Sequence, residues 1–325
     1  MGATPASPVV SVVVPSFNYG HLIAQTLDSV LAQSSPDWEC VVVDDGSTDD
    51  TADVVSAYTR RDRRFSYVSQ RNAGLSAARN AGLRRSQGTY FQFLDADDVV
   101  EPSKLEHHVS YLNAHPYVGI VYGPARYFTT ADPTQRRYSW TDPDTPWMPQ
   151  VSGSGQVLVN ALLDTNIMPV NSALVRREVL RRIGPFDERL QALEDWEYWI
   201  RCALGGVHFH FLDRENTYAL VRLHEGSMST DSLRMRAALV RHYRTTVRLA
   251  PNPTTRTSLC QRLVEARKAL SELQIARGMI LKGGLHRASL AFSQRHYTLA
   301  AKIIVALLLV PVLGRSRFAS WTERS

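Results

Sequence analysis

Short apolar runs alternate with amphipathic segments along roughly the first 230 residues. Runs such as 9–14 and 40–43 are almost continuously apolar and rich in valine, which is typical of strands buried on both faces. Strands alternating with helices predict βαβ units and a doubly wound α/β fold with a mostly parallel sheet. The expected strands are 9–14, 40–43, 65–69, 90–94, 118–122, 172–175, 207–212 and 217–221, and the expected helices are 21–33, 51–58, 76–86, 102–113 and 193–204.

Two regions break this alternation. Residues 129–155 are rich in Pro, Thr, Asp, Ser and Gly and lack apolar periodicity, so they predict a long loop. From about residue 233 the pattern is wholly helical, with a break expected at 251–253, where two prolines flank an asparagine. We therefore expect an α/β domain at residues 1–232 and a helical C-terminal extension at residues 233–325.

Polar side chains gather where the predicted strands end. In open parallel sheets, ligands bind beyond the carboxyl ends of the strands, so these side chains should share one rim. Considered from the residues alone, this convergence is the strongest indication of a functional site. The residues concerned are Pro15, Ser16, Asn18, Asp44, Asp45, Arg71, Asp95 and Asp97.

The acidic segment Asp95-Ala96-Asp97 directly follows the predicted strand 90–94. Carboxylates at positions i and i+2 are close enough to share one Mg²⁺ or Mn²⁺ ion, and both ions prefer oxygen ligands completed by substrate phosphates. In the alternative interpretation, the acids only favour the start of the helix that Pro102 opens.

Other polar residues could bind a ligand or could have an ordinary structural role. Asp44 and Asp45 are placed to accept hydrogen bonds from a base or a ribose, or else to cap the following helix. Arg71 and Arg79 flank a helix start rich in Ala and Gly. They are suited to contact a base and phosphates, or else they are solvated beside a closely packed helix.

Two more polar clusters lie later in the chain. Glu194 and Asp195 precede Trp196, and a carboxylate desolvated beside an aromatic ring gains basicity. The alternative is an exposed, acidic helix start. Arg222 and His224 follow another strand and suit a phosphate or a metal, although a lone histidine in a loop usually has no such role.

As an ordered set, these segments resemble the GT-A fold of the inverting glycosyltransferase family that includes cellulose, chitin and hyaluronan synthases. The resemblance covers roughly residues 9–230. Its motifs are Val12–Asn18, Val43–Asp49, Arg71–Gly82, Phe93–Asp98, Gly184–Glu188 with Glu194–Trp196, and Arg222–Ser229.

The resemblance implies a nucleotide-sugar donor, expected to be a UDP-sugar, and roles for the donor-side residues. Pro15, Arg71 and Asp44 or Asp45 would hold the base, and Asp95 the ribose. The same donor site is expected to include Ser16, Asn18, Arg79 and Ala96.

The resemblance also assigns the metal and the reaction. Asp97 would ligate a divalent cation, Mn²⁺ or Mg²⁺, that bridges the diphosphate, with His224 as a second metal residue. His224, Arg222 and Ser229 would close over the diphosphate. Asp195 would be the general base, with Glu194 as its neighbour, acting on a hydroxyl of a glycan or lipid-linked glycan acceptor.

Two features of the synthases are missing. The sequence has no Gln-x-x-Arg-Trp motif, which processive members carry, and no multi-span membrane channel. Both absences favour transfer of one or a few sugars over the synthesis of long chains.

Charge divides the chain at about the same place as the pattern. Residues 1–232 carry 20 Lys and Arg against 28 Asp and Glu, a net charge of −8, whereas residues 233–325 carry 17 against 3, a net charge of +14. A basic extension indicates an anionic partner surface. No nucleic-acid-binding motif accompanies it, so we expect no nucleic-acid partner and favour an anionic lipid surface.

The end of the chain leaves the membrane question open. Residues 303–313 are strongly apolar but too short to cross a bilayer. Helices within residues 285–320 either lie on a membrane surface or pack as ordinary core or oligomer contacts. The three cysteines are unpaired by spacing and the N-terminus lacks the features of a secretory signal. We expect a cytoplasmic protein, peripheral on the inner face of the membrane if the first interpretation holds.

Two other classes compete with a transferase. One is a non-catalytic nucleotide-sugar-binding module with a helical adaptor for a membrane or protein, and retention of Asp95, Asp97 and Asp195 counts against it. The other is an NTP-dependent enzyme, which lacks support because the chain has neither a P-loop nor a dinucleotide fingerprint.

Overall fold

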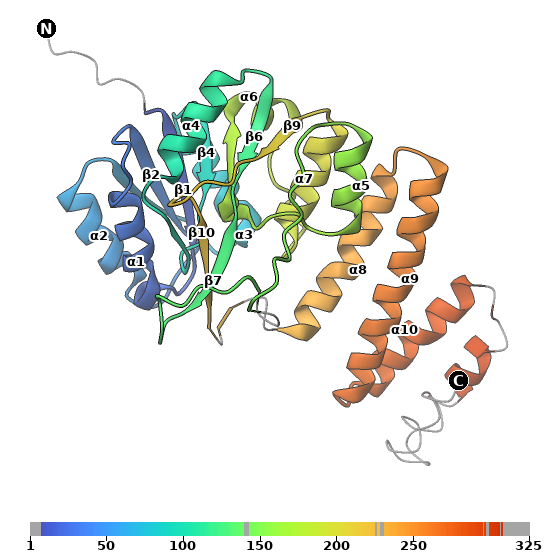
Figure 1. The fold of residues 1–325 in the computed structure, drawn as a ribbon. Helices are drawn as coiled ribbons and strands as arrows, with labels where there is room; N and C mark the ends of the chain where they lie inside the picture. Colours follow the sequence, from blue (N-terminus) through green and yellow to red (C-terminus); the bar gives the residue numbers. More distant parts are fainter. Residues whose placement is uncertain are drawn as a thin grey trace, which may run out of the picture. The chain divides into compact units, whose positions relative to one another are not determined.

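The computed structural model describes residues 8–139, 143–224, 226–227, 231–294, 296, 299–305 and 307 (Figure 1). The chain divides into two compact units, residues 1–225 and 226–325, which are described separately here. The sequence pattern placed this boundary seven residues later, at the start of the first helix of the second unit.

Seven strands among the described residues of the first unit form one sheet in the order β3-β2-β1-β4-β8-β6-β9. All neighbouring pairs are parallel except those that β8 makes with β4 and β6. This confirms the predicted mostly parallel α/β fold. The strands are β1 (Val10–Ser16), β2 (Trp38–Asp44), β3 (Phe65–Ser69), β4 (Tyr90–Phe93), β6 (Val118–Tyr122), β8 (Ala173–Arg176) and β9 (His208–Phe211).

The strand order changes direction at β1, because β2 and β3 lie on one side of it and β4 on the other. At such a switch point the loops after the neighbouring strands part and leave a crevice. The ends of β1, β2 and β4 therefore share one rim. Pro15 does not end β1, as the sequence suggested, because the strand continues to Ser16, paired with Asp44 of β2.

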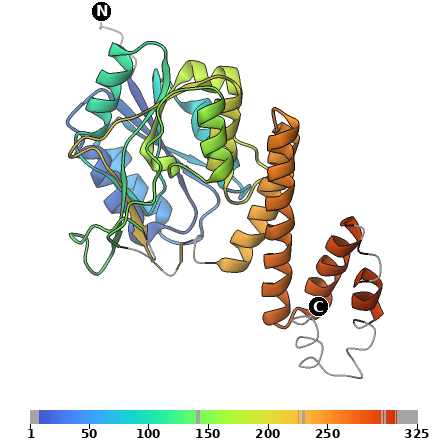
Figure 2. The same cartoon turned by 45° about the vertical axis from the view of Figure 1, so that its right-hand side comes forward.

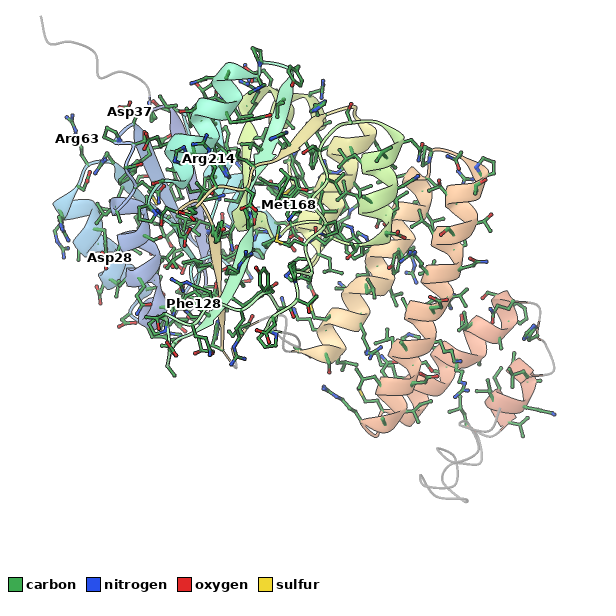
Figure 3. The ribbon with its side chains drawn as sticks, viewed as in Figure 1. Asp28, Asp37, Arg63, Phe128, Met168 and Arg214 are labelled. Atoms are coloured by element: carbon green, nitrogen blue, oxygen red, sulfur yellow. The ribbon has the colours of Figure 1, made fainter. Side chains whose placement is uncertain are left out.

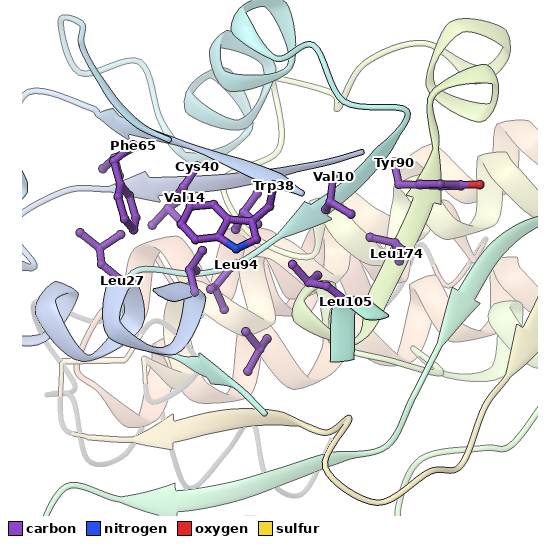
Figure 4. Packing of buried hydrophobic residues seen from close by; sticks show 14 of the residues in the cluster. Val10, Val14, Leu27, Trp38, Cys40, Phe65, Tyr90, Leu94, Leu105 and Leu174 are labelled. Carbon is purple, nitrogen blue, oxygen red and sulfur yellow. The ribbon is translucent and has the colours of Figure 1, made fainter. Parts of the chain in front are cut away.

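Helices cover both faces of this sheet. On one face, valines of β1 and β2 pack with Leu27 and Leu105 in the main core (Figure 4). On the other face, Val41 and Val43 pack against Ala78 and Ala81. The helices are α1 (Gly20–Leu31), α2 (Thr51–Arg61), α3 (Leu75–Arg85), α4 (Lys104–Ala114), α5 (Gln156–Asp164), α6 (Arg177–Ile183) and α7 (Glu194–Leu204).

The small residues of α3 have a specific consequence for the site. A Cβ atom at Gly82 would overlap the side chain of Val13, so glycine lets the helix lie directly on β1 and β2. This close approach buries Arg79, one turn earlier, to 1% exposure beneath the strand ends.

A second, three-stranded sheet was not expected from the sequence. Its order is β5-β10-β7, with β5 (Val99–Val100), β7 (Ala125–Thr129) and β10 (Ala219–Leu223). The helices α5 and α6 were also missed. The predicted loop after residue 129 agrees with the structure, since no helix or strand lies in the described residues between β7 and α5.

The regular structure described within the second unit is helical. It contains α8 (Ser232–Leu249), α9 (Pro253–Ala276) and α10 (Ile280–Ser293), and α9 packs against both other helices (Figure 2). The expected break falls between α8 and α9, where Asn252 accepts a hydrogen bond from the N–H of Thr255 at 2.9 Å. Within the described part of the chain, no helix is both long and apolar enough to cross a bilayer.

Candidate active site

The acidic turn after β4 contains Asp95, Asp97 and Asp98, and Asp98 stabilises its conformation. Asp98 is 4% exposed, and its carboxylate accepts from the backbone N–H of Arg222 at 2.7 Å and from the side chain of Asn171. Asn171 also accepts from the N–H of Asp95 at 2.9 Å. The carbonyl of the buried Ala96 accepts from the hydroxyl of Thr26 at 2.9 Å. The turn is thus fixed by Asp98 and Ala96, and Asp95 and Asp97 are the acids with partly exposed side chains.

Asp97 faces His224 across the end of β10. The Oδ2 atom of Asp97 lies 2.8 Å from Nε2 of His224, and both side chains are less than one-fifth exposed. The ring of Tyr19 meets that of His224 edge-on, and burial with the negative charge of Asp97 raises the pKa of the Tyr19 hydroxyl. Among the described residues no group of three His, Cys, Asp or Glu side chains is arranged to hold a metal alone. A cation here would need further ligands from a substrate.

Arg222 forms hydrogen bonds that connect several segments of the site. Its Nε donates to the carbonyl of Asp97 at 2.7 Å, and its terminal nitrogens donate to Thr130 at 3.1 Å and Gln25 at 2.7 Å. The guanidinium also stacks 4.5 Å from the ring of Phe128 on β7, which is labelled in Figure 3. These bonds use three of the five N–H donors of Arg222 and join β10 to the acidic turn. The predicted contact with phosphates would depend on the two remaining N–H groups of a residue that is 1% exposed.

Arg79 joins the two acidic clusters that lie far apart in sequence. One terminal nitrogen donates to Asp95 at 2.6 Å, and the other donates to Glu194 at the start of α7. Burial alone would lower the pKa of this guanidinium, but the two carboxylates overcome that effect and raise it. The predicted contact of Arg79 with the nucleotide has little room in this arrangement, because the side chain is buried between its two partners.

Asp195 follows Glu194 in the chain, and its pKa is raised. Its carboxylate accepts from the N–H of Trp196 at 2.7 Å and from the side chain of Asn166 at 3.1 Å. Burial, together with the charge of Glu194, raises the pKa of Asp195 to about 7, although Arg79 opposes the shift. A carboxyl group with this pKa is half ionised near neutral pH, which suits a general base.

Asp44, at the end of β2, is buried, and both of its oxygens have partners. One accepts from the N–H of Ser47 at 2.7 Å and the other from the hydroxyl of Tyr67 at 2.5 Å. These bonds fix the carboxylate at the rim and leave further lone pairs on the same oxygens.

Asp45 holds the segment that leads into α3. It accepts from the side chain of Gln70 at 2.7 Å and from the N–H groups of Ala73 and Gly74 at 2.9 and 2.8 Å. Arg71, within this segment, is exposed and contacts no acid among the described residues. Asp45 therefore orients the loop, while the guanidinium of Arg71 is available to a ligand.

The loop after β1 is tied to the loop after β2. Asn18 has a φ of 60°, its N–H donates to Ser47 Oγ at 2.8 Å, and its side-chain oxygen accepts from the N–H of Thr48 at 2.8 Å. Ser16, next to Pro15, is 3% exposed, and its hydroxyl has no hydrogen-bond partner in the described part of the chain. Asn18 thus serves loop geometry, whereas Ser16 offers an unused polar atom at the switch point.

Ser229 lies outside the described residues, so its predicted place in the closing loop has no structural account. The supporting residues that the sequence reasoning missed are Tyr19, Gln25, Asn166 and Asn171. Each is a single polar residue without a motif around it. Only the position of Asn171 just before the expected strand 172–175 offered a signal.

A small cavity of about 100 Å³ opens farther along the same rim, beyond the ends of β6 and β9. Its wall combines aromatic rings of Tyr138 and Trp147 with Arg126 and Asp213. Aromatic faces beside polar groups suit a sugar ring. The loop 129–155 supplies both aromatic residues, so this loop helps to shape the part of the rim away from Asp44.

Similarity to known proteins identifies the family of the chain. Residues 11–184 match the model of glycosyl transferase family 2. The chain is 44% identical over 106 residues to the putative teichuronic acid biosynthesis glycosyltransferase TuaG of Bacillus subtilis, a match covering 32% of this chain and 42% of that protein. It is 27% identical over 202 residues to the uncharacterized glycosyltransferase RP339 of Rickettsia prowazekii, covering 60% and 58%. These matches span less than two thirds of the curated relatives' length.

Solved structures show the same fold. That of S. aureus TarS 1-349 in complex with UDP-GlcNAc superposes with a TM-score of 0.63 at 18% identity, covering 97% of this chain and 90% of that one. The mannosyltransferase PcManGT of Pyrobaculum calidifontis, in complex with GDP-Man and Mn²⁺, gives 0.58 at 23% identity, covering 95% and 88%. The chain belongs to glycosyl transferase family 2, and its first unit has the GT-A fold.

Proposed function

We propose that the protein transfers a sugar from a nucleotide-sugar donor, a UDP-sugar, to a hydroxyl group of a glycan or lipid-linked glycan, with inversion at the anomeric carbon. The observation that carries the proposal is the Asp95–Arg79–Glu194 bridge. Through this bridge, the buried guanidinium of Arg79 joins the acidic turn after β4 to the start of α7, where Asp195 lies.

Donor recognition is assigned to the switch point. Asp44 and Arg71 would hold the base, with Pro15 beside it, and Asp95 the ribose. Both the free hydroxyl of Ser16 and the exposed guanidinium of Arg71 support this assignment. TarS with UDP-GlcNAc and PcManGT with GDP-Man are relatives in fold that bind donors of this class.

A divalent cation, Mn²⁺ or Mg²⁺, fits the residues at the turn. Asp97 and His224 would hold it, and two protein ligands suit an ion whose remaining ligands are diphosphate oxygens. When bound, such an ion neutralises negative charge on the leaving diphosphate.

Asp195 then performs the proton transfer. Its carboxylate takes the proton of the acceptor hydroxyl while the acceptor oxygen forms a bond to the anomeric carbon. The bond from that carbon to the diphosphate oxygen breaks in the same step, and the nucleoside diphosphate leaves with the electron pair. Asn166 orients the base through its hydrogen bond. Glu194 contributes charge that keeps Asp195 basic.

The donor assignment is tested by nucleoside diphosphate release from a panel of UDP- and GDP-sugars with Mn²⁺ or Mg²⁺. We expect slow release from one UDP-sugar without acceptor and a fall of at least about a hundredfold in Asp97→Asn, because the ligand charge is lost. Asp53→Asn, an exposed acid on α2, should leave release unchanged. Donor binding without release from any donor, with or without candidate acceptors, would instead favour a non-catalytic binding module.

The rate of transfer should depend on pH through Asp195. Because its pKa is raised to about 7, the base is protonated below that pH, and kcat/KM should fall about tenfold per unit as the solution becomes more acidic. Glu194→Gln removes a charge that raises this pKa, so the acidic limb should move to lower pH. An acidic limb that stays in place in this variant would assign the titration to another group.

We propose transfer of one or a few sugars, without processive polymerisation, because the sequence lacks the Gln-x-x-Arg-Trp motif. The cavity lined by Tyr138 and Trp147 is our candidate for part of the acceptor site. A cytoplasmic location at the membrane surface would place the enzyme beside a lipid-linked acceptor.

A further inference from the structure

The second unit exposes large apolar side chains on its last helices. Counting the described residues of both units, seven large hydrophobic side chains are exposed, and four of them lie between residues 285 and 305. They are Leu285, Phe292, Ile304 and Val305, with exposures of 58, 64, 47 and 55%. Such a concentration marks an interaction surface, whereas isolated exposed apolar residues are ordinary.

The helical positions show how this surface is built. Leu285 and Phe292 are seven residues apart on α10, so they lie on one face, which also carries the exposed Lys282. The opposite side of α10 packs inward. A Cβ at Gly283 would contact Ile275 of α9, and one at Gly284 would contact Leu307, so the helical residues near 299–307 lie against α10.

The charges close to these side chains in the sequence have one sign, and the preceding acid, Glu272 on α9, lines a cavity on the side of α10 that carries Leu290 and Ala291. Residues 273–322 contain seven Lys and Arg and no Asp or Glu. Lys282 and Lys302 are exposed next to the apolar residues in sequence. Apolar side chains flanked by long cationic side chains match the interface of an anionic bilayer, where the apolar groups enter the acyl boundary and the cations reach headgroup phosphates.

Other occupants fit this surface less well. A second copy of the chain would bring two cationic surfaces together, and like charges at an interface are unfavourable. The first unit exposes only Phe17, Tyr117 and Val157 as large apolar residues in its described part, and they lie on separate elements. It therefore offers no matching apolar patch.

We propose that Leu285 and Phe292 of α10, with Ile304 and Val305, form a docking surface for an anionic lipid bilayer, held there by Lys282 and Lys302. Docking does not require a spanning helix. It would keep the enzyme at the membrane while the first unit carries out the chemistry, and it does not depend on which sugar is transferred.

Sedimentation of the full-length protein with vesicles tests the proposal. We expect binding to vesicles of phosphatidylcholine mixed with phosphatidylglycerol and little binding to phosphatidylcholine alone. Leu285→Ser with Phe292→Ser should weaken binding about tenfold or more, since apolar burial in the bilayer is lost. Lys282→Gln should weaken it about fivefold, and Lys302→Gln by a similar factor. High salt should reproduce the lysine effect by screening.

The matched control is Tyr117→Ser with Val157→Ser, which removes two exposed apolar side chains from the first unit and should leave vesicle binding unchanged. Far-ultraviolet circular dichroism and thermal unfolding check that all variants remain folded. Equal binding to both vesicle types would overturn the proposal. Unchanged vesicle binding in the Leu285 and Phe292 variant would also overturn it. If that variant instead alters the mass of the protein in solution, the four side chains form a self-association surface.

Discussion

Asp195→Asn should lower kcat for sugar transfer about a thousandfold, within the range of about 10² to 10⁴ that a positioned general base contributes. The amide keeps the size of the carboxylate, but it has one oxygen where the carboxylate has two, so it can accept either from Asn166 or from the N–H of Trp196. It cannot accept the proton of an acceptor hydroxyl. Donor affinity should change little, because Asp195 lies on α7 while the assigned donor residues lie at or just after the ends of β1, β2, β3 and β4. Initial rates of nucleoside diphosphate release with acceptor present, together with donor binding by calorimetry, measure the two effects.

A matched control separates this effect from a general response to losing an acid near α7. Glu178→Gln removes an exposed carboxylate from α6, which packs against α7, and we expect its rate to stay within a few-fold of wild type. If Asp195→Asn keeps most of its rate while its donor affinity falls, Asp195 belongs to the donor site and the proposed direction of attack is wrong.

The central sheet could be predicted from the sequence because its strands are buried on both faces. The runs that became β1 and β2 are rich in valine, and their burial on both faces favours strands. The second sheet was missed for the opposite reason. β5 has two residues, and β7 alternates small, charged and aromatic residues without a clear period. The pairing of these strands with β10 comes from tertiary contacts that the local pattern does not encode.

The gathering of polar side chains at one rim could be predicted from the strand ends, but the contacts that distinguish neighbouring residues there could not. Asp97 and Asp98 are adjacent in sequence and chemically identical. They differ because Asp98 is enclosed by Asn171 and the backbone of Arg222, whereas Asp97 faces His224. The same holds for the two arginines near α3. The sequence analysis assigned both arginines to the nucleotide, yet Arg79 is buried because Gly82 lets its helix approach the sheet.

Asp195 illustrates a property that the sequence suggested only in direction. A carboxylate desolvated beside an aromatic ring was expected to gain basicity, and burial is the largest cause of the raised pKa of Asp195, followed by the charge of Glu194. The bond from Trp196 is made by its backbone N–H and lowers the pKa of Asp195. The indole N–H is directed elsewhere, to the carbonyl of Leu162 at 2.6 Å.

Arg79→Met should reduce both stability and activity. Methionine fills a similar apolar volume but leaves Asp95 and Glu194 without their shared cation, and removing one partner of a buried ion pair costs about 3–5 kcal/mol of unfolding free energy. The deficit should be largest at neutral and alkaline pH. It should shrink in acid, where protonation of the Asp95 carboxyl group, whose pKa burial raises, removes one unpaired charge. Chemical denaturation of both proteins between acidic and neutral pH measures it.

Two further variants decide what Arg79 does. Arg84→Met, on the exposed side of the same helix, should change stability by less than about 1 kcal/mol. Adding Glu194→Gln to Arg79→Met should recover part of the lost stability, because one unpaired charge is gone, but it should not restore the rate, because the bridge that holds α7 and Asp195 to the acidic turn is still broken. A double variant with full transfer activity would show that the bridge serves folding alone, and that Asp95 and Asp195 keep their relative positions through other contacts.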